Sequence, residues 1–297
     1  MLSIAKISLL AVRESYATIG KNEGGGTVEK QRKALLTGCV ALAAALLTLL
    51  AVAWLLPSPE VPPVPTDPPG PTLPSNPYTQ EDFRMEDGFM TCLAGETAAG
   101  VDVSSHQGIV DWQQVKAAGI SFAIIRLGYR GYETGQLHID PYALANLQGA
   151  TDAGLQVGAY FYSQATSVEE AENEAALALS VLDGFSLALP VAYDWEYVSD
   201  SARTANMDPE TLLDCTLAFC QAVEKGGYEA MVYFNPSLAR NLLDLIPLQE
   251  AGYPFWLAYY TLEMDYPHRV SLWQYSDQGT VPGITGRVDL NLLFYYQ

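Results

Sequence analysis

Strand-like and helix-like segments alternate along most of this chain, and that alternation limits its fold more than any other feature. Apolar runs typical of buried strands cover residues 100–103, 121–127, 155–162, 189–194, 229–234, 255–259, 272–275 and 288–294. Capped, glycine-terminated helical patterns separate the earlier runs, at residues 111–118, 141–153, 168–182, 209–225 and 236–243. Little helical pattern separates the last three runs. The sequence therefore predicts an α/β fold: a single β/α barrel of about eight strands whose last helices are missing.

A membrane anchor is predicted before the barrel. Residues 34–56 are 23 residues without a charge, and a helix of that length spans about 34 Å, enough to cross a bilayer. Residues 1–33 carry six basic and three acidic side chains, a net +3. The positive-inside rule then places this tail in the cytoplasm and the rest of the chain outside, as a single-pass membrane protein. A secreted protein, cleaved near Ala53 by signal peptidase, is the alternative.

A linker is predicted between the anchor and the barrel. Residues 57–77 contain ten prolines, a composition typical of extended polyproline chain that builds no core. Residues 78–99 are polar and acidic, and they are either more linker or a strap on the domain. The predicted organisation is a tail at 1–33, a transmembrane helix at 34–56, a linker at 57–99 and a catalytic barrel at 100–297.

Charge and cysteine content exclude several functions. The total net charge is −19, so the chain after residue 33 carries −22, and nucleic acid is excluded as a partner because phosphate binding needs clustered Lys and Arg. The four cysteines form no C-x-x-C pair and there are only three histidines, so we expect no metal site and no cofactor. We expect Cys92, Cys215 and Cys220 to be free buried thiols, although a bridge from Cys92 to one of the others stays open.

Two carboxylates follow the fourth predicted strand. Asp194 and Glu196 are two residues apart, so they point to one face while Trp195 points to the other. Same-face neighbours on a strand lie roughly 6.5–7 Å apart, a spacing at which one acid can protonate a glycosidic oxygen while the other stays ionised.

Other polar side chains are expected at the same rim, because active sites of β/α barrels form where the strands end. Further acids there are Asp102, on the first strand, and Asp289, at the start of the eighth. The predicted substrate contacts are aromatic side chains that stack on sugar rings and one cation that can pair with a rim acid: Tyr160, Tyr162, Tyr233, Trp273, Tyr275 and Arg126.

Seven short motifs give the chain, from about residue 99 to 297, a resemblance to the glycoside hydrolase family 25 lysozymes. In order they are Gly100-Val101-Asp102-Val103-Ser104, His106-Gln107-Gly108, Asp111-Trp112, Val157-Gly158-Ala159-Tyr160-Phe161-Tyr162, Tyr193-Asp194-Trp195-Glu196-Tyr197, Trp273-Gln274-Tyr275 and Val288-Asp289-Leu290-Asn291. The resemblance implies an N-acetylmuramidase that binds peptidoglycan glycan strands. It also implies a retaining, substrate-assisted mechanism in which Glu196 is the general acid, Asp194 stabilises the substrate's acetamido group, and Asp102 and Asp289 are supporting acids.

Two alternatives remain open at this point. A chitinase-like endo-N-acetylglucosaminidase also uses a D-x-E pair on the fourth strand of a barrel, and a non-catalytic glycan-binding module would keep the aromatic rim. We expect a monomer in each case.

Overall fold

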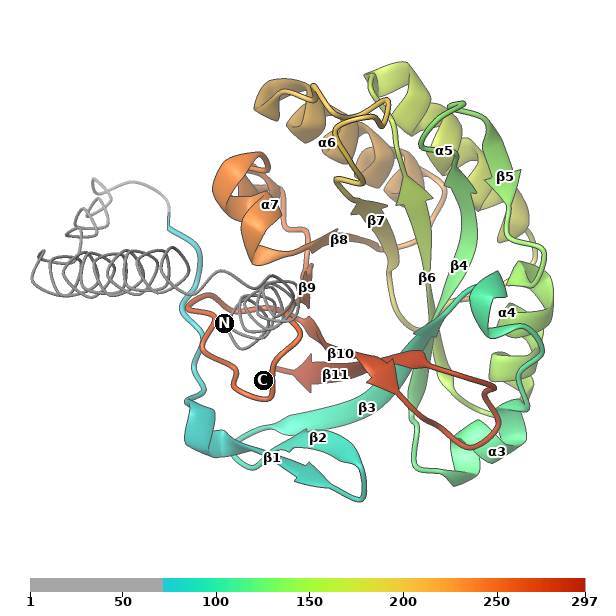
Figure 1. The fold of residues 1–297 in the computed structure, drawn as a ribbon, viewed down its shortest axis with the longest axis vertical. Coiled ribbons are helices and arrows are strands. Elements are labelled where there is room, and N and C mark those ends of the chain that lie inside the picture. Colours follow the sequence, from blue (N-terminus) through green and yellow to red (C-terminus); the bar gives the residue numbers. More distant parts are fainter. Residues whose placement is uncertain (1–71, 297) are drawn as a thin grey trace, which may run out of the picture. The chain divides into compact units, whose positions relative to one another are not determined.

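The structure is a computed structural model that describes residues 72–296. Eight strands of its nine-stranded main sheet form the barrel (Figure 1): β3 (Glu96–Val103), β4 (Phe122–Arg130), β6 (Gln156–Ser163), β7 (Val191–Trp195), β8 (Ala230–Phe234), β9 (Phe255–Ala258), β10 (Leu272–Gly279) and β11 (Val288–Tyr295). Neighbouring strands pair in the order β3-β11-β10-β9-β8-β7-β6-β4, and β4 pairs with β3. The sheet therefore closes on itself, and the predicted eight-stranded barrel is confirmed.

The last strand runs against its neighbours. The pairs from β3 through β4, β6, β7, β8 and β9 to β10 are parallel, whereas β11 is antiparallel to both β10 and β3. The start of β11 therefore lies at the rim where the parallel strands end. In this register Asp289 is opposite Asp102.

Six helices of the described chain lie outside the ring of strands: α3 (Trp112–Ala117), α4 (Ala143–Asp152), α5 (Val168–Val181), α6 (Pro209–Lys225), α7 (Pro236–Asn241) and α8 (Leu245–Glu250). Polar N-cap side chains begin most of them; Ser167, for example, accepts a hydrogen bond from the amide of Glu170. The connections at residues 259–271 and 280–287 contain no helix, as the sequence predicted. The short helix α8 was not predicted.

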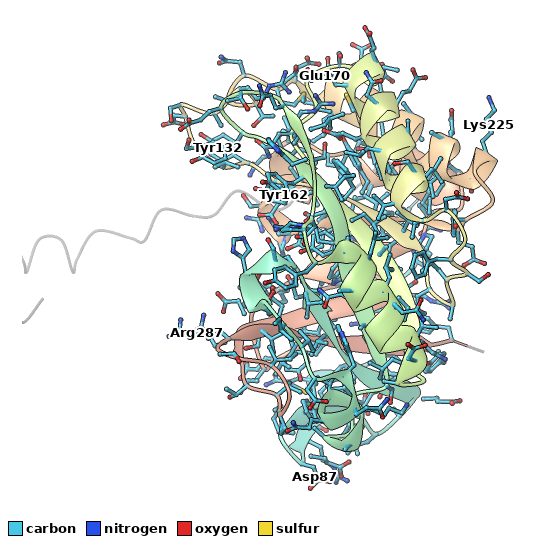
Figure 2. All side chains as sticks on the ribbon, turned by 90° about the vertical axis from the view of Figure 1, so that its right-hand side faces the viewer. Asp87, Tyr132, Tyr162, Glu170, Lys225 and Arg287 are labelled. Atoms are coloured by element: carbon cyan, nitrogen blue, oxygen red, sulfur yellow. The ribbon has the colours of Figure 1, made fainter. Side chains whose placement is uncertain are left out.

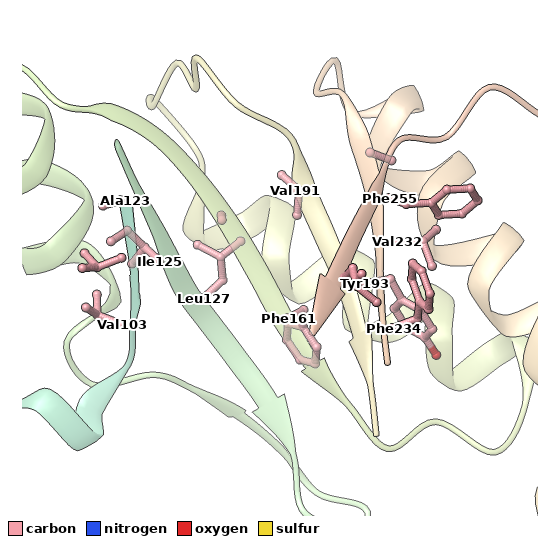
Figure 3. Packing of buried hydrophobic residues seen from close by; sticks show 14 of the residues in the cluster. Val103, Ala123, Ile125, Leu127, Phe161, Val191, Tyr193, Val232, Phe234 and Phe255 are labelled. Carbon is pink, nitrogen blue, oxygen red and sulfur yellow. The ribbon is translucent and has the colours of Figure 1, made fainter. Parts of the chain in front are cut away.

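Side chains of the strands alternate between two apolar layers, as a period of two requires. One layer fills the barrel interior and includes Ile124, Tyr160 and Trp256. The other packs the strands against the helices, and Figure 3 shows part of it, with Ala123, Ile125, Leu127, Phe161, Val191, Tyr193, Val232 and Phe234. A side chain's position in a strand thus decides whether it can reach the interior.

The domain begins earlier than the predicted boundary at residue 100. Residues 83–92 form a hairpin of β1 (Phe83–Glu86) and β2 (Phe89–Cys92), and β3 starts at Glu96. Tyr78 stacks on Phe294 with ring centroids 5.6 Å apart, and Phe83 packs edge-on against Trp273 at 5.5 Å. Residues 78–99 are therefore a strap on the barrel and not a linker, because their aromatic side chains cover the outer face of β10 and β11. The short strand β5 (Leu137–Ile139), which pairs with β4, was also not predicted.

The anchor prediction is not addressed by this structure. The predicted tail, the transmembrane helix at 34–56 and the proline-rich residues up to 71 lie outside the described residues. Within residues 72–296, no helix combines the length and apolar character that crossing a bilayer requires. In this part of the chain Cys92, Cys215 and Cys220 are buried and form no disulfide with one another, as expected.

Candidate active site

Four carboxylates converge at the rim where the parallel strands end. Asp102 lies at the end of β3, Asp194 near the end of β7, Glu196 just after it, and Asp289 is the second residue of β11. Along each strand, the neighbours of these carboxylates, such as Trp195, belong to the outer layer. All four carboxylates therefore face the interior. Their charges act on one another: the charge of Asp102 raises the pKa of Asp194, Glu196 and Asp289. The expected carboxylate cluster is present.

Asp194 and Glu196 are neighbours within this cluster. Burial raises the pKa of Asp194 well above its usual range, and the nearby charges of Glu196 and Asp102 raise it further. Burial also raises the pKa of Glu196, and the charge of Asp102 adds to this shift. Two raised values mean that the pair keeps a proton at pH values where an exposed carboxyl has lost its own.

The Asp194 carboxyl also has an unused acceptor. Its side chain is 5% exposed, and its Oδ1 atom has no hydrogen-bond partner among residues 72–296. Buried polar atoms of folded proteins nearly always have hydrogen-bond partners. Asp194 Oδ1 is an exception, and in this carboxylate cluster it can accept a hydrogen bond from a ligand's N–H or O–H group.

Neutral donors hold Asp102. Its Oδ2 atom accepts hydrogen bonds from Asn291 Nδ2 at 2.7 Å and from Gln274 Nε2 at 2.8 Å. Asn291 is oriented in turn by Trp256, whose Nε1 donates to Asn291 Oδ1 at 2.9 Å. Burial still raises the pKa of Asp102, and the two amides reduce the shift without adding a positive charge.

Gln274 links Asp102 to two tyrosines. Its Oε1 atom accepts from the hydroxyls of Tyr233 at 3.0 Å and Tyr260 at 3.1 Å. Neither Tyr260 nor Trp256 was singled out from the sequence, because nothing local distinguishes them from other aromatic residues near strands. Gln274, in contrast, stands in one of the seven sequence motifs, and it shares a strand face with Leu272, which lies in the interior layer.

Burial raises the pKa of Asp289 to about 8, and the charge of Asp102 and a hydrogen bond to its carboxylate add to the shift. A raised pKa of this size means that the Asp289 carboxyl keeps its proton at neutral pH, opposite Asp102 in the pairing of β3 and β11.

Three predicted aromatic contacts lie on the interior face and two do not. Tyr160 and Tyr233 both pack edge-on against Trp256 inside the barrel, and Tyr162 is less buried and follows Tyr160 on the same face. Figure 2 shows Tyr162 on the same side of the molecule as Tyr132, away from Lys225 at the end of α6.

Trp273 and Tyr275 were wrongly predicted to contact substrate. Trp273 is fully buried (0% exposed) and donates to the carbonyl of Tyr259 at 2.8 Å, while the Tyr275 hydroxyl accepts from the amide of Met90. Both belong to the outer layer. Residues 273 and 275 share one strand face, so when Gln274 faces the interior they must face the strap.

Arg126 does not pair with a rim acid, contrary to one expectation from the sequence. Its Nε donates to Asp140 Oδ2 at 2.8 Å and its Nη2 to Ser105 Oγ at 2.9 Å. Asp140 also accepts from the backbone amides of Ser105 and Tyr142. Arg126 therefore ties the loop after β3 to the loop before α4, and it influences Asp194 only by lowering that group's pKa from a distance.

Comparisons with known proteins agree with this arrangement. The family model described as "Glycosyl hydrolases family 25" matches residues 101–284. Lysozyme M1 of Streptomyces globisporus is 27% identical over 201 residues, covering 65% of this chain and 66% of that protein.

Two solved structures are also similar. The bacterial lysozyme from Streptomyces coelicolor has a TM-score of 0.55 and 28% identity, covering 65% of this chain and 90% of the other. The modular autolysin LytC from Streptococcus pneumoniae, solved in complex with a synthetic peptidoglycan ligand, has a TM-score of 0.57 and 26% identity. That match covers 67% of this chain but only 47% of the LytC chain, so this chain corresponds to about half of LytC.

Proposed function

Because this chain belongs to glycosyl hydrolase family 25, we propose that it is a peptidoglycan hydrolase that cuts the β-1,4 bond between N-acetylmuramic acid and N-acetylglucosamine. The observation that carries the proposal is the Asp194–Glu196 pair, two carboxyls with raised pKa values at the barrel rim beside two further acids. Acid-catalysed cleavage of a glycosidic bond needs a group that is protonated at the working pH together with a negative charge near the sugar.

In the proposed reaction Glu196 gives its proton to the glycosidic oxygen as the bond to the sugar's C1 breaks. The carbonyl oxygen of the substrate's own 2-acetamido group attacks C1 and forms an oxazolinium ion, whose N–H is stabilised by the Asp194 carboxylate. Water then attacks C1 on the opposite face and gives a proton to the Glu196 carboxylate. Two displacements at C1 retain the anomeric configuration.

The protonation of the free enzyme has a consequence for this scheme. Burial favours the proton on Asp194, whereas the reaction requires it on Glu196. The two carboxyls act on each other's pKa at the same rim, so a change in the surroundings of one of them shifts the proton to the other. A substrate N–H that donates to the unpartnered Oδ1 of Asp194 favours the ionised form of Asp194 and so moves the proton to Glu196.

Supporting roles follow from the contacts. Asp102 is held by Gln274 and Asn291 and places a negative charge near Asp194. Asp289 lies opposite Asp102 on the neighbouring strand. Tyr162, the less buried of the interior tyrosines, is the strongest candidate to contact a sugar ring, whereas Tyr160 and Tyr233 line the interior beneath it. No step uses a metal or a cofactor.

The test is product analysis. The full chain, solubilised in detergent, is incubated with purified peptidoglycan, the products are reduced with borohydride, and the reduced sugar is identified by mass spectrometry. Reduced muramic acid supports the proposal. Reduced glucosamine would assign the endo-N-acetylglucosaminidase activity, and no product from a folded protein would favour a glycan-binding module.

We also propose that residues 34–56 tether the domain to the outer face of the cell membrane. The support is sequence alone: 23 uncharged residues preceded by Lys30, Arg32 and Lys33. Because the domain already includes residue 72, the spacer shrinks to residues 57–71, at most about 47 Å at 3.1 Å per residue. Fractionation of cells that express a C-terminally tagged chain decides between the tether and a secreted form. Protein in the culture fluid that begins near Trp54 would refute the tether.

A further inference from the structure

Gln164 is a fully buried polar side chain (0% exposed) that lies outside the carboxylate cluster but touches its backbone. It follows directly after β6. Its Nε2 donates to the carbonyls of Glu196 at 2.7 Å and Ser163 at 2.9 Å, and its Oε1 accepts from the hydroxyl of Thr204 at 2.9 Å. Both amide protons and the amide oxygen are used, so these partners fix which way the side chain points.

The contact to Glu196 lies where regular pairing stops. The ladder between β6 and β7 ends with Ser163 opposite Trp195, so the carbonyl of Glu196 lies one residue beyond it. The Gln164 side chain supplies a hydrogen bond at that place. Next to it, the indole of Trp195 donates to the carbonyl of Ala165 at 3.2 Å, which holds the other face of the same segment.

The loop that follows Glu196 is anchored to the same point. Arg203 Nη1 donates to the carbonyl of Gln164 at 2.5 Å, and its guanidinium makes two further bonds to Glu170, at 2.6 and 2.7 Å. Desolvation opposes ionisation of Glu170, but the hydrogen bonds from Arg203 and Thr166 and the charge of Arg130 together outweigh it and lower the pKa of Glu170 to about 2. The ion pair is therefore present at every pH at which the domain is expected to work. The Arg203 amide also donates to the carbonyl of Tyr132, on the loop after β4.

From these contacts we propose that Gln164 is a positioning residue for the general acid: it fixes the backbone of Glu196 and connects it to the anchored loop at residues 197–208. This inference rests on the proposed function. General-acid catalysis is sensitive to placement, and a displacement of about 1 Å can cost on the order of 10²-fold in rate. The chain keeps a buried amide here because an apolar side chain would leave two carbonyls without donors.

The first variant, Gln164→Leu, keeps the approximate volume and removes both donors. We expect kcat on peptidoglycan to fall roughly 30- to 100-fold while KM changes less than about 3-fold, because no substrate contact is removed. An unchanged kcat in a folded variant would overturn the proposal.

The second variant, Gln164→Glu, tests whether the side chain acts by donating hydrogen bonds or only by filling space. Its capacity to donate depends on pH, whereas its volume does not. Its ionised side chain faces two carbonyl oxygens and donates nothing, whereas its protonated form can donate to one of them. The ratio of variant to wild-type kcat/KM should therefore rise as pH falls. A ratio that stays flat while the variant remains folded would contradict the proposal.

A matched pair of threonines controls for loss of stability. Thr204 and Thr216 are each 1% exposed, and each hydroxyl donates one hydrogen bond, to Gln164 and to the carbonyl of Leu212 respectively. Thr204→Val should lower kcat about 3- to 10-fold, whereas Thr216→Val, in the middle of α6, should leave it unchanged. Equal losses in both variants would mean that kcat follows stability and not the position of Glu196.

Hydrogen exchange keeps this inference distinguishable from the proposed function. In Gln164→Leu, backbone amides of residues 197–208 should exchange faster than in the wild type while those of α6 do not. Unchanged exchange in that loop would overturn the positioning role even if the wild type is an active muramidase. A wild type with normal exchange and no hydrolase activity would refute the proposed function, and with it a catalytic role for Gln164.

Discussion

Replacing Asp289 with asparagine should stabilise the domain at neutral pH. In the folded protein burial and the neighbouring charge of Asp102 raise the pKa of this carboxyl to about 8. An asparagine amide has nearly the same shape, so Asp289→Asn keeps the packing and removes the ionisable group. In the unfolded chain, in contrast, this carboxyl has its ordinary pKa of about 3.8.

The sign follows from these two pKa values. Below about pH 4 Asp289 is protonated in both states, and its contribution to stability is fully present. Between about pH 4 and 8 only the unfolded chain ionises, so wild-type stability falls as pH rises by about 1.4 kcal/mol per pH unit. Asparagine does not titrate, so the advantage of the variant should grow across this window and level off above about pH 8.

The size of the effect can be bounded. The interval from 3.8 to pH 7 gives an upper limit of about 4 kcal/mol. Because Asp289 shares its environment with Asp102 and is not fully buried, we expect roughly half of that, about 2 kcal/mol, or roughly 4–8 °C in Tm for a domain of this size. At pH 3 the two proteins should agree to within about 0.5 kcal/mol.

The assay is urea unfolding followed by tryptophan fluorescence at pH 3, 5 and 7. Asp214→Asn is the control, because it removes an exposed carboxylate from α6 and should change stability by less than about 0.5 kcal/mol at any of these pH values. Equal stability of wild type and Asp289→Asn at pH 7, or a larger difference at pH 3 than at pH 7, would show that Asp289 is ionised in the folded protein and would refute the reasoning.

Three further outcomes test the site. Glu196→Gln should lower kcat by at least about 10²-fold without loss of folding, since it removes only the transferable proton; a variant with more than about a tenth of the wild-type rate would exclude Glu196 as the acid. Asp194→Asn should also lose most activity. For the wild type, NMR of fresh product should show the retained anomer first. An inverted first product would rule out participation of the acetamido group. Trp273→Ala should cost about 3–5 kcal/mol of stability yet leave the KM of the remaining folded protein unchanged, which titration of folded variant with peptidoglycan fragments can check.

The sequence by itself determined the architecture and the pair that carries the proposed chemistry. Alternating apolar runs and capped helices depend on neighbours along the chain, so eight barrel strands and the absence of helices after β9 could be predicted. The same period of two placed Asp194 and Glu196 on one face and Trp195 on the other, and the structure confirms this arrangement.

Only the tertiary structure decided which strand face lies in the barrel interior and which residues distant in sequence make contact. Period two shows that Trp273 and Tyr275 share a face opposite to Gln274, but only barrel closure and the strap of residues 78–99 decide which face is the interior. Arg126 lies 14 residues before its partner Asp140, and Gln164 lies 32 residues before Glu196. Such contacts arise because parallel strands bring loops distant in sequence to one rim, where burial then sets the pKa of each acid.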